Sequence, residues 1–260
     1  MGSTLRSEAW ASGIVAVVMV VVAAGRLRRL PELRSAAALL AIGAGLLGAP
    51  AMGAAVHGVA GEPVIRTVAL CFVPVLVTVL SGLGNEGKSL SFWPGLMGLA
   101  GALLVLPLRL PSDVVGWVFL VVPPLAVSVA CVACRTAALH VAAEWSAALV
   151  FAGGAVCLVL IEVWRAVETG APAQAFSVWA VALDAVLAVA AIAVVLQVEA
   201  PRYVSRYFMV PLLAVISNVV VFRFNVGLRV GAGMVLMAAG AVSLLNSRGT
   251  GDGTSELHLR

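Results

Sequence analysis

The chain has few charged residues and few aromatic ones. Of its 260 residues, 11% are charged and 6% are aromatic, with two tyrosines. Soluble domains carry about a quarter charged residues, so this composition excludes a soluble enzyme or binding module for most of the chain. The alternating strands of about ten residues and the aromatic girdles of an outer-membrane barrel are also missing. The chain therefore does not have the composition of either class.

Cysteines are scarce and common catalytic motifs are absent. The four cysteines all lie in apolar runs, which is not how a disulfide framework or a structural zinc site is built. Cys131 and Cys134 form a CxxC pair, but no second pair accompanies them. No GxSxG, HExxH, Walker-type or dinucleotide-binding glycine motif occurs in a fitting context. We expect no metal, no cofactor and no enzyme activity.

The sequence is instead rich in long apolar stretches. Hydrophobic residues make up 62% of the chain, its mean hydropathy is +1.12, and apolar runs recur from Trp10 to Leu245. About 20 helical residues cross the core of a bilayer. The sequence predicts an all-α, polytopic transmembrane bundle of about nine spans. We place these spans at 9–25, 36–58, 63–83, 92–109, 113–134, 138–163, 174–197, 201–222 and 227–246.

Basic residues set the expected topology. Arg26, Arg28, Arg29 and Arg34 follow the first span, and the positive-inside rule places such a loop in the cytoplasm. Alternation from that loop leaves most of the sixteen Lys and Arg residues inside. We therefore expect an external N-terminus, a cytoplasmic C-terminus and a multi-pass protein of the cell membrane (inner or plasma). The net charge of +4 is spread over many loops, so no nucleic-acid partner is expected.

Two spans share a pattern that indicates internal repetition. PVIRTVALCFVPVLVTVLSGL and PRYVSRYFMVPLLAVISNVV each open with a proline and carry a second one near the middle, Pro74 and Pro211. When these prolines are aligned, Ser81 falls on Asn218. Four spans precede the break near residue 110 and five follow it, so halves of five spans with one helix missing would be inverted repeats. We divide the chain into a first repeat (1–110), a second repeat (111–246) and a disordered cytoplasmic tail (247–260).

The same segments resemble a known family. FVPVLVTVLSGLGNEGKSLSFWPGLMGLAGALLVLP and YFMVPLLAVISNVVVFRFNVGLRVGAGMVLMAAGAVSLLNSR are similar to the drug/metabolite transporter superfamily, EamA type. In that family each half ends with a Pro-Leu helix, a short loop that often holds a Gly-Glu pair, and a glycine-rich helix. Glu86 stands at the loop position of the first half, whereas Arg223 stands there in the second. The resemblance covers about residues 34 to 247, and it implies a bundle that lacks the first of ten helices and exports a small metabolite or drug-like solute by alternating access.

Asp184 is the candidate site residue with the most distinctive position. It lies at the middle of a predicted span, where a charge facing lipid costs about 2.5 to 3.5 kcal/mol on insertion scales. We expect Asp184 to face the bundle interior and to bind substrate or a proton. The alternative is an aspartate that is protonated or that only hydrogen-bonds a neighbouring helix.

Polar residues at helical spacing mark two further faces, one on each Pro-bearing span. Such faces suit a central pathway, because proline frees a backbone carbonyl. The alternative is close helix packing with hydroxyls bonded to their own backbone. Arg66 lies one turn inside an outer helix end, where it could attract an anion or extend to the headgroups. The two faces comprise Thr67, Cys71, Pro74, Thr78 and Ser81 on the first span, and Tyr203, Tyr207, Pro211, Ala214 and Asn218 on the second. The predicted substrate-binding residues are Asp184, Thr78, Ser81, Tyr207, Asn218 and Arg66.

Two other functions compete with transport. A membrane-embedded enzyme acting on lipid would place two or more acids or histidines at one depth, and the sequence offers one deep acid. A relic or scaffold of the transporter fold would lack an open cavity between its polar faces. His140 and Glu144, one helical turn apart, predict either a proton relay or an interfacial pair. We expect the bilayer and a small-molecule substrate as partners, and a homodimer stays open.

Overall fold

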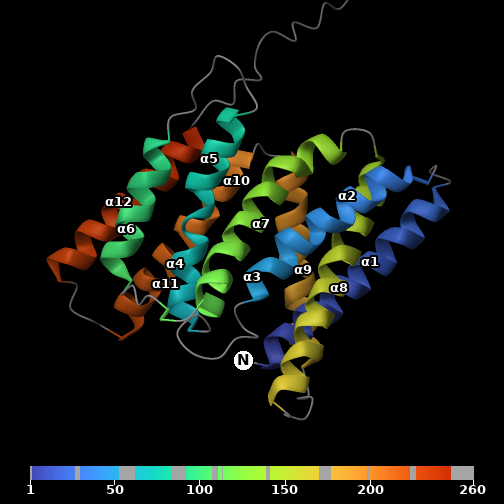
Figure 1. Cartoon of the computed structure of the whole chain (residues 1–260), viewed down its shortest axis with the longest axis horizontal. Coiled ribbons are helices and arrows are strands. Elements are labelled where there is room, and N and C mark those ends of the chain that lie inside the picture. The colour runs from blue at the N-terminus through green and yellow to red at the C-terminus, as the bar shows by residue number, and fades with distance from the viewer. Residues whose placement is uncertain are drawn as a thin grey trace, which may run out of the picture.

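The protein is an all-α membrane bundle, as the sequence predicts. The computed structural model (Figure 1) describes residues 2–26, 30–52, 62–83, 92–106, 111–112, 114–138, 141–169, 177–197, 200–222 and 227–246. Within these ranges every regular element is helical. The helices are α1 (Gly2–Gly25), α2 (Leu33–Gly43), the π-helical turn η1 (Ala44–Gly48), α3 (Ala49–Met52), α4 (Pro63–Leu70), α5 (Val73–Leu83), α6 (Trp93–Val105), α7 (Val114–Ala138), α8 (Ala143–Thr169), α9 (Val178–Gln197), α10 (Ala200–Val204), α11 (Arg206–Phe222) and α12 (Leu228–Asn246).

Seven helical segments are long and apolar enough to cross a membrane. They are Leu5–Gly25, Leu33–Met52, Val64–Gly82, Gly116–Cys134, Ala143–Glu168, Arg202–Val221 and Leu228–Asn246. Trp93–Val105 and Val178–Val194 are shorter apolar helices at the remaining two predicted positions. The chain is therefore a multi-pass membrane protein.

The two Pro-bearing spans are interrupted, each by a break of one or two residues. The first breaks at Cys71 and Phe72, between α4 and α5, and the second at Ser205, between α10 and α11. A proline inside a helix leaves the carbonyl four residues earlier without its usual N–H donor. For Pro211 that carbonyl belongs to Tyr207, and it accepts a hydrogen bond from Cys71 Sγ at 3.3 Å. The freed carbonyl thus connects the two spans that share the repeat pattern.

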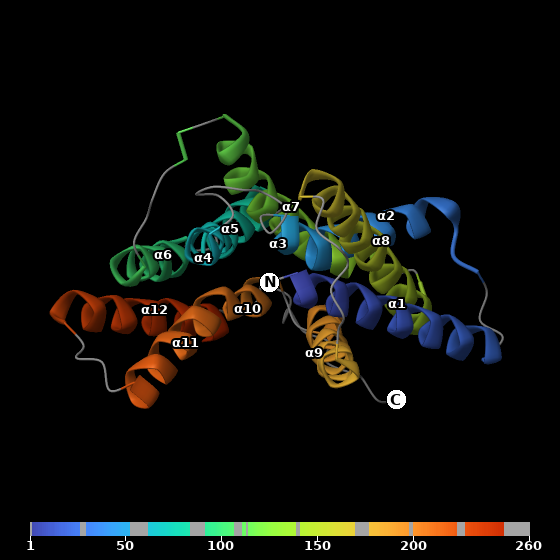
Figure 2. The same ribbon diagram turned by 90° about the horizontal axis from the view of Figure 1, so that it is seen from below.

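The bundle has two sides joined by α7. Helices α4, α5, α6, α10, α11 and α12 lie on one side, and α1, α2, α8 and α9 on the other (Figures 1 and 2). Helix α6 packs along α12, and α1 packs along α8. Helix α7 contacts α4 and α5 on the first side and α2, η1 and α3 on the second. The helices of residues 1–110 are therefore interleaved with those of residues 111–246 rather than packed as a separate unit.

Candidate functional site

Asp184 lies in a small cavity where α1 and α9 meet. The Ser7 hydroxyl on α1 donates a hydrogen bond to Asp184 Oδ2 at 2.5 Å. Glu8, the next residue on α1, interacts electrostatically with Asp184 and with Arg66 of α4. Ser12, one turn further along α1, is buried at the same place. We call this space of about 250 Å³ the acid cavity, and its lining residues are Glu8, Ser12, Leu47, Leu158, Asp184, Leu187 and Ala188.

Arg66 joins the acid cavity to the start of α4. Its Nη2 atom donates a hydrogen bond to the Pro50 carbonyl at 3.2 Å, and its guanidinium interacts with the Glu8 carboxylate. The Arg66 Nε atom is buried and has no hydrogen-bond partner within the described residues. The structure thus brings together two of the predicted site residues, Asp184 and Arg66, with Glu8 between them.

Glu8 is the residue that the sequence analysis missed. The first span was placed from residue 9, whereas α1 begins at Gly2, so Glu8 lies inside the helix and not in front of it. Glu8 is thus a second acid within the described spans, one turn from the start of the segment Leu5–Gly25, in addition to the one deep acid that the sequence indicates. A signal was present, because Glu8 and Ser12 are four residues apart and share a helix face. The prediction overlooked it because the first span was placed on the most apolar residues, which begin after Glu8.

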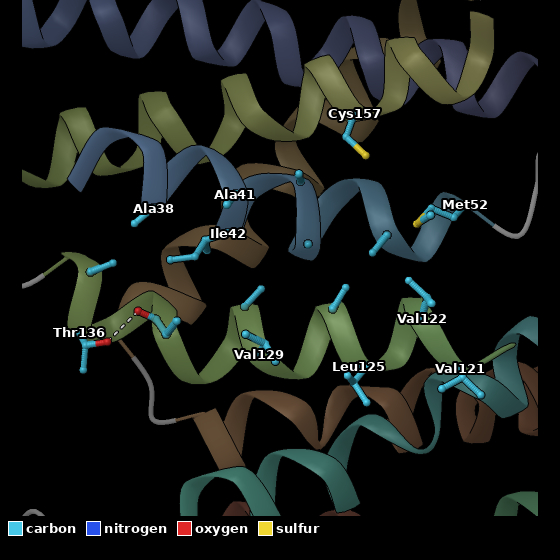
Figure 3. Close-up of a pocket in the computed structure, with 17 residues that line it drawn as sticks. Ala38, Ala41, Ile42, Met52, Val121, Val122, Leu125, Val129, Thr136 and Cys157 are labelled. Atoms are coloured by element: carbon cyan, nitrogen blue, oxygen red, sulfur yellow. Dashed lines mark hydrogen bonds between the residues drawn. The ribbon is translucent and has the colours of Figure 1, made fainter. Parts of the chain in front are cut away.

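A much larger cavity separates α2, η1 and α3 from α7. Figure 3 shows the α2-to-α3 segment as one wall and α7 as the other, with Cys157 of α8 beyond the α2-to-α3 segment. Its volume is about 1010 Å³, and its walls carry mostly alanine, valine and leucine side chains. Thr136 lies at one end, where its hydroxyl donates to the Ala133 carbonyl at 2.9 Å. We call this space the apolar groove. It is lined by Ala38, Ala41, Ile42, Ala44, Gly45, Ala49, Met52, Val121, Val122, Leu125, Ala126, Val129, Ala130, Ala133, Thr136, Ala137 and Cys157.

The π-helical turn η1 separates the two cavities. Ala44 and Gly45 face the apolar groove, and Leu47 faces the acid cavity. π-Helical turns are rare in proteins, and those that occur often lie at functional sites. On the side of α8 the segment is packed without room to spare, since a Cβ atom on Gly48 would lie 2.3 Å from Cys157 Sγ. One short irregular turn therefore contacts a large apolar space and a small acidic one.

The other predicted substrate-binding residues lie outside both cavities. The buried Thr78 hydroxyl donates to the Val75 carbonyl of its own helix at 2.8 Å. This bond agrees with the alternative interpretation, in which the hydroxyls of packed helices bond to their own backbone. Ser81 is half-buried on α5, and Asn218 is exposed on α11. Tyr207 is buried and lines a separate cavity between α4 and α11. In the second half of α11 the predicted polar face is not buried in the bundle, because Ala214 and Asn218 are exposed.

Several predicted features fall on other parts of the chain. Glu144 forms an ion pair with Arg26 at the α1–α8 contact, whereas His140, its expected partner, lies outside the described residues. Glu86, Arg223 and the tail 247–260 also lie outside them. In the part of the chain that the structure describes, no group of three or more His, Cys, Asp and Glu side chains is placed to hold a metal ion.

Comparisons with family models, with curated proteins and with solved structures found no match to this chain. The similarity to EamA-type transporters therefore stays a prediction from the two quoted segments.

Proposed function

We propose that this protein is a transporter that moves a small apolar or amphipathic solute across the membrane by alternating access. The observation that carries the proposal is the placement of the apolar groove and the acid cavity on opposite sides of η1. In this proposal the apolar groove is the solute site, the acid cavity is the ion site, and η1 is the wall that they share.

The apolar groove supports the choice of solute. Small-molecule sites are concave, mostly apolar and about 300 to 1,000 Å³ in volume, and the groove has about 1010 Å³. Eight of its seventeen lining residues are alanines, whose small side chains leave room between the helices. Such a lining suits a metabolite or drug-like compound with an apolar body.

The acid cavity supports proton coupling. Ionisable residues within membrane spans mark proton relays and substrate pathways by default. We assign one exchangeable proton to Glu8, whose carboxyl group interacts electrostatically with Asp184. Ser7 donates to Asp184 Oδ2, and Arg66 also interacts electrostatically with Glu8. Loss of the proton would add a negative charge between α1 and α9, next to Leu47 of η1.

The arrangement of the repeats supports alternating access. The contacts of α1 with α8, of α6 with α12 and of α4 with α11 join spans that correspond to one another when Pro74 is aligned with Pro211. Inverted repeats that meet in pairs can exchange conformations around a central site. We infer export of the solute from the cell, in keeping with the family resemblance.

A membrane-embedded enzyme is the second candidate, and Glu8 is the observation that favours it. Glu8 and Asp184 supply the two neighbouring acids that such an enzyme would use for general acid and base catalysis. The apolar groove has the volume for a lipid-sized substrate, however, and η1 stands between the groove and both acids. The separation favours transport over chemistry on the solute.

The test is flux in proteoliposomes with an imposed pH gradient, measured over a panel of fluorescent amphiphilic compounds and normalised to inserted protein. We expect Glu8→Gln and Asp184→Asn to lower gradient-driven flux by about 100-fold, the lower range for loss of a proton-transferring group. Glu168→Gln, at an exposed acid on α8, is the matched control and should leave flux unchanged.

Wild-type flux in both cavity variants would reject proton coupling, and the absence of gradient-driven flux for every compound would reject transport. Turnover of added lipid, lost in the same two variants, would instead establish the enzyme.

We also infer an external N-terminus and a cytoplasmic C-terminus. Single cysteines in place of Ser3 and Ser255 should react with an impermeant maleimide from outside and from inside, respectively. Labelling of both from one side would reject this orientation.

A further inference from the structure

Arg66 connects α4 to α3, the short helix at one end of the apolar groove. Its Nη2 atom donates a hydrogen bond to the Pro50 carbonyl at 3.2 Å. Pro50 lies in α3 between Ala49 and Met52, which both line the groove. The hydrogen bond from Arg66 therefore holds a part of the groove wall against the start of α4.

The guanidinium of Arg66 has a donor that is not used. Its Nε atom is buried and has no hydrogen-bond partner within the described residues. The group interacts electrostatically with the carboxyl of Glu8, but among the described residues no hydrogen bond or ion pair joins the two side chains. A buried donor on a charged group that lacks an acceptor costs free energy. An arrangement that gives Nε an acceptor is therefore favoured.

An ionised Glu8 can supply that acceptor. Arginine and carboxylate prefer a paired contact of two parallel N–H···O bonds, and Nε and Nη2 present such a pair of donors along one edge of the guanidinium. A carboxylate at this edge competes with the Pro50 carbonyl for Nη2. A neutral Glu8 lacks the charge that strengthens the paired contact, so that Arg66 remains on Pro50.

Glu8 is the acid that can act on Arg66. The charged groups that influence Glu8 are Asp184 of α9 and Arg66 of α4, and the group that influences Arg66 is Glu8. Asp184 instead accepts its hydrogen bond from Ser7. Helix α8 also packs against α1, and its acids are paired or exposed. They are Glu144, paired with Arg26, Glu162, paired with Arg165, and the exposed Glu168.

Cys157 lies where a movement of α3 can be detected. Met52 and Cys157 both line the apolar groove, and both also line a second apolar cavity of about 340 Å³; Figure 3 labels the two side chains. Gly48, the residue before α3, packs closely on this thiol, since a Cβ atom there would lie 2.3 Å from Cys157 Sγ. A displacement of α3 from α8 therefore changes how well the thiol is covered.

We propose that Arg66 is a positioning residue that couples the proton on Glu8 to the shape of the apolar groove. With Glu8 neutral, Arg66 stays on the Pro50 carbonyl and holds α3 in the position that the structure shows. When Glu8 releases its proton to water, the carboxylate takes the Nε edge of Arg66, the hydrogen bond to Pro50 is lost, and α3 is free to move. This role rests on the proposed function, because it is the contact through which the acid cavity acts on the groove.

The experiment measures alkylation of Cys157 by N-ethylmaleimide in the full chain in phosphatidylcholine nanodiscs, with mass spectrometry of the Cys157 peptide as the readout. The wild type is compared with Glu8→Gln, which mimics the neutral acid, at each pH from about 6 to about 9. Both chains share the same thiol, so its own ionisation does not affect the ratio of rates. We expect equal rates at the lowest pH and a wild-type rate about fivefold higher at the highest, the lower end of typical couplings between two sites.

Variants of Arg66 test whether this residue carries the coupling. With Arg66→Gln present in both chains, the ratio of rates should fall to one at every pH. Arg66→Lys should keep part of the fivefold difference, since it retains the charge but not the planar fork. Arg229→Gln, at an exposed arginine of α12, is the matched control and should keep all of it. The buried Cys134 should react equally slowly in every variant if the fold is intact.

Equal rates in the wild type and Glu8→Gln at every pH would overturn the proposal, as would a difference that persists with Arg66→Gln. If Arg66→Gln does not purify as a monodisperse protein, Arg66→Met decides by the same comparison. Alkylation needs neither a solute nor a gradient, so its outcome is separate from that of the flux assay. An Arg66-dependent difference without flux would reject transport and keep the coupling, and flux without the difference would do the reverse.

Discussion

Two pairs of helices are packed through glycine, and they differ in what lies behind them. In the α6–α12 pair, a Cβ atom on Gly101 would lie 2.6 Å from the Gly233 carbonyl oxygen. In the α2–α8 pair, a Cβ atom on Gly153 would lie 2.0 Å from the Leu40 carbonyl oxygen. Behind α6 and α12 lies a filled core that includes Phe208. Behind α2 lies the apolar groove.

The comparison shows that one packing device can serve two purposes. Small residues let helix backbones approach closely in a membrane, where apolar surface alone does not drive helices together. The α6–α12 contact borders a filled core, which favours one arrangement of the two helices. Helix α2 packs against both α8 and α7, but it also borders the groove, so part of its surface is available to a solute.

The largest effect on stability should come from Gly101→Ala. The new methyl group would lie 2.6 Å from backbone atoms of α12, and overpacking of this kind costs about 1 to 3 kcal/mol of unfolding free energy. Thermal unfolding in detergent measures it. The matched control is Gly82→Ala, whose Cβ would meet nothing within 4 Å; equal stability of the two variants would contradict the expectation.

A smaller loss of stability should follow from Gly153→Ala, although its clash with Leu40 is nominally closer. Helix α2 borders the apolar groove, and we expect it to shift toward that space and relieve part of the strain. We expect a cost at the lower end of the same range, about 1 kcal/mol, together with reduced flux because the groove narrows. A loss of stability as large as that of Gly101→Ala would show that the groove side of α2 is not free.

Filling the groove should affect flux and spare stability. Ala41 lines the groove and is exposed, so Ala41→Phe should cost no more than about 0.5 kcal/mol while it occludes the solute space. We expect a fall in flux of about tenfold or more, as for substitutions that obstruct a binding site. Ala182→Phe, on the exposed face of α9 and not among the groove residues, should transport normally. The two variants are compared in the proteoliposome assay at equal inserted protein.

The smallest effect should come from Arg26→Gln at the α1–α8 contact. The Arg26 side chain is 62% exposed, and exposed ion pairs contribute about 0 to 1 kcal/mol. Thermal unfolding should detect a shift within that range that shrinks further at high salt. A larger, salt-independent loss would mean that this charge holds α1 against α8.

The sequence was sufficient for the class of protein and for the approximate positions of its spans, because each depends on local composition. Hydropathy identifies apolar runs, and Pro74 and Pro211 mark the spans that are interrupted. Asp184 could be singled out because a carboxyl in a span is costly wherever its partner lies. Its hydrogen-bond donor, Ser7, is 177 residues away in the chain, and no local pattern connects them.

The two cavities could not be predicted for a different reason. The groove is lined by alanine, valine and leucine, which are also the residues that face lipid elsewhere on the bundle. Which of these side chains border a cavity is decided by the distance between α2 and α7. Glu8 escaped notice because it precedes the most apolar part of α1. Arg206 was counted as a topology signal, although its burial between Tyr203 and Tyr207 depends on how α11 turns at Ser205.

The thiol of Cys157 can report whether the apolar groove is occupied. Cys71, Cys131 and Cys134 are buried, whereas Cys157 is half-buried and forms part of the wall of the apolar groove. Alkylation by a small membrane-permeant reagent should therefore reach this thiol first, and a compound seated in the groove should shield it. The unmodified chain can thus be screened for ligands by following the rate of a single covalent reaction, without an added dye.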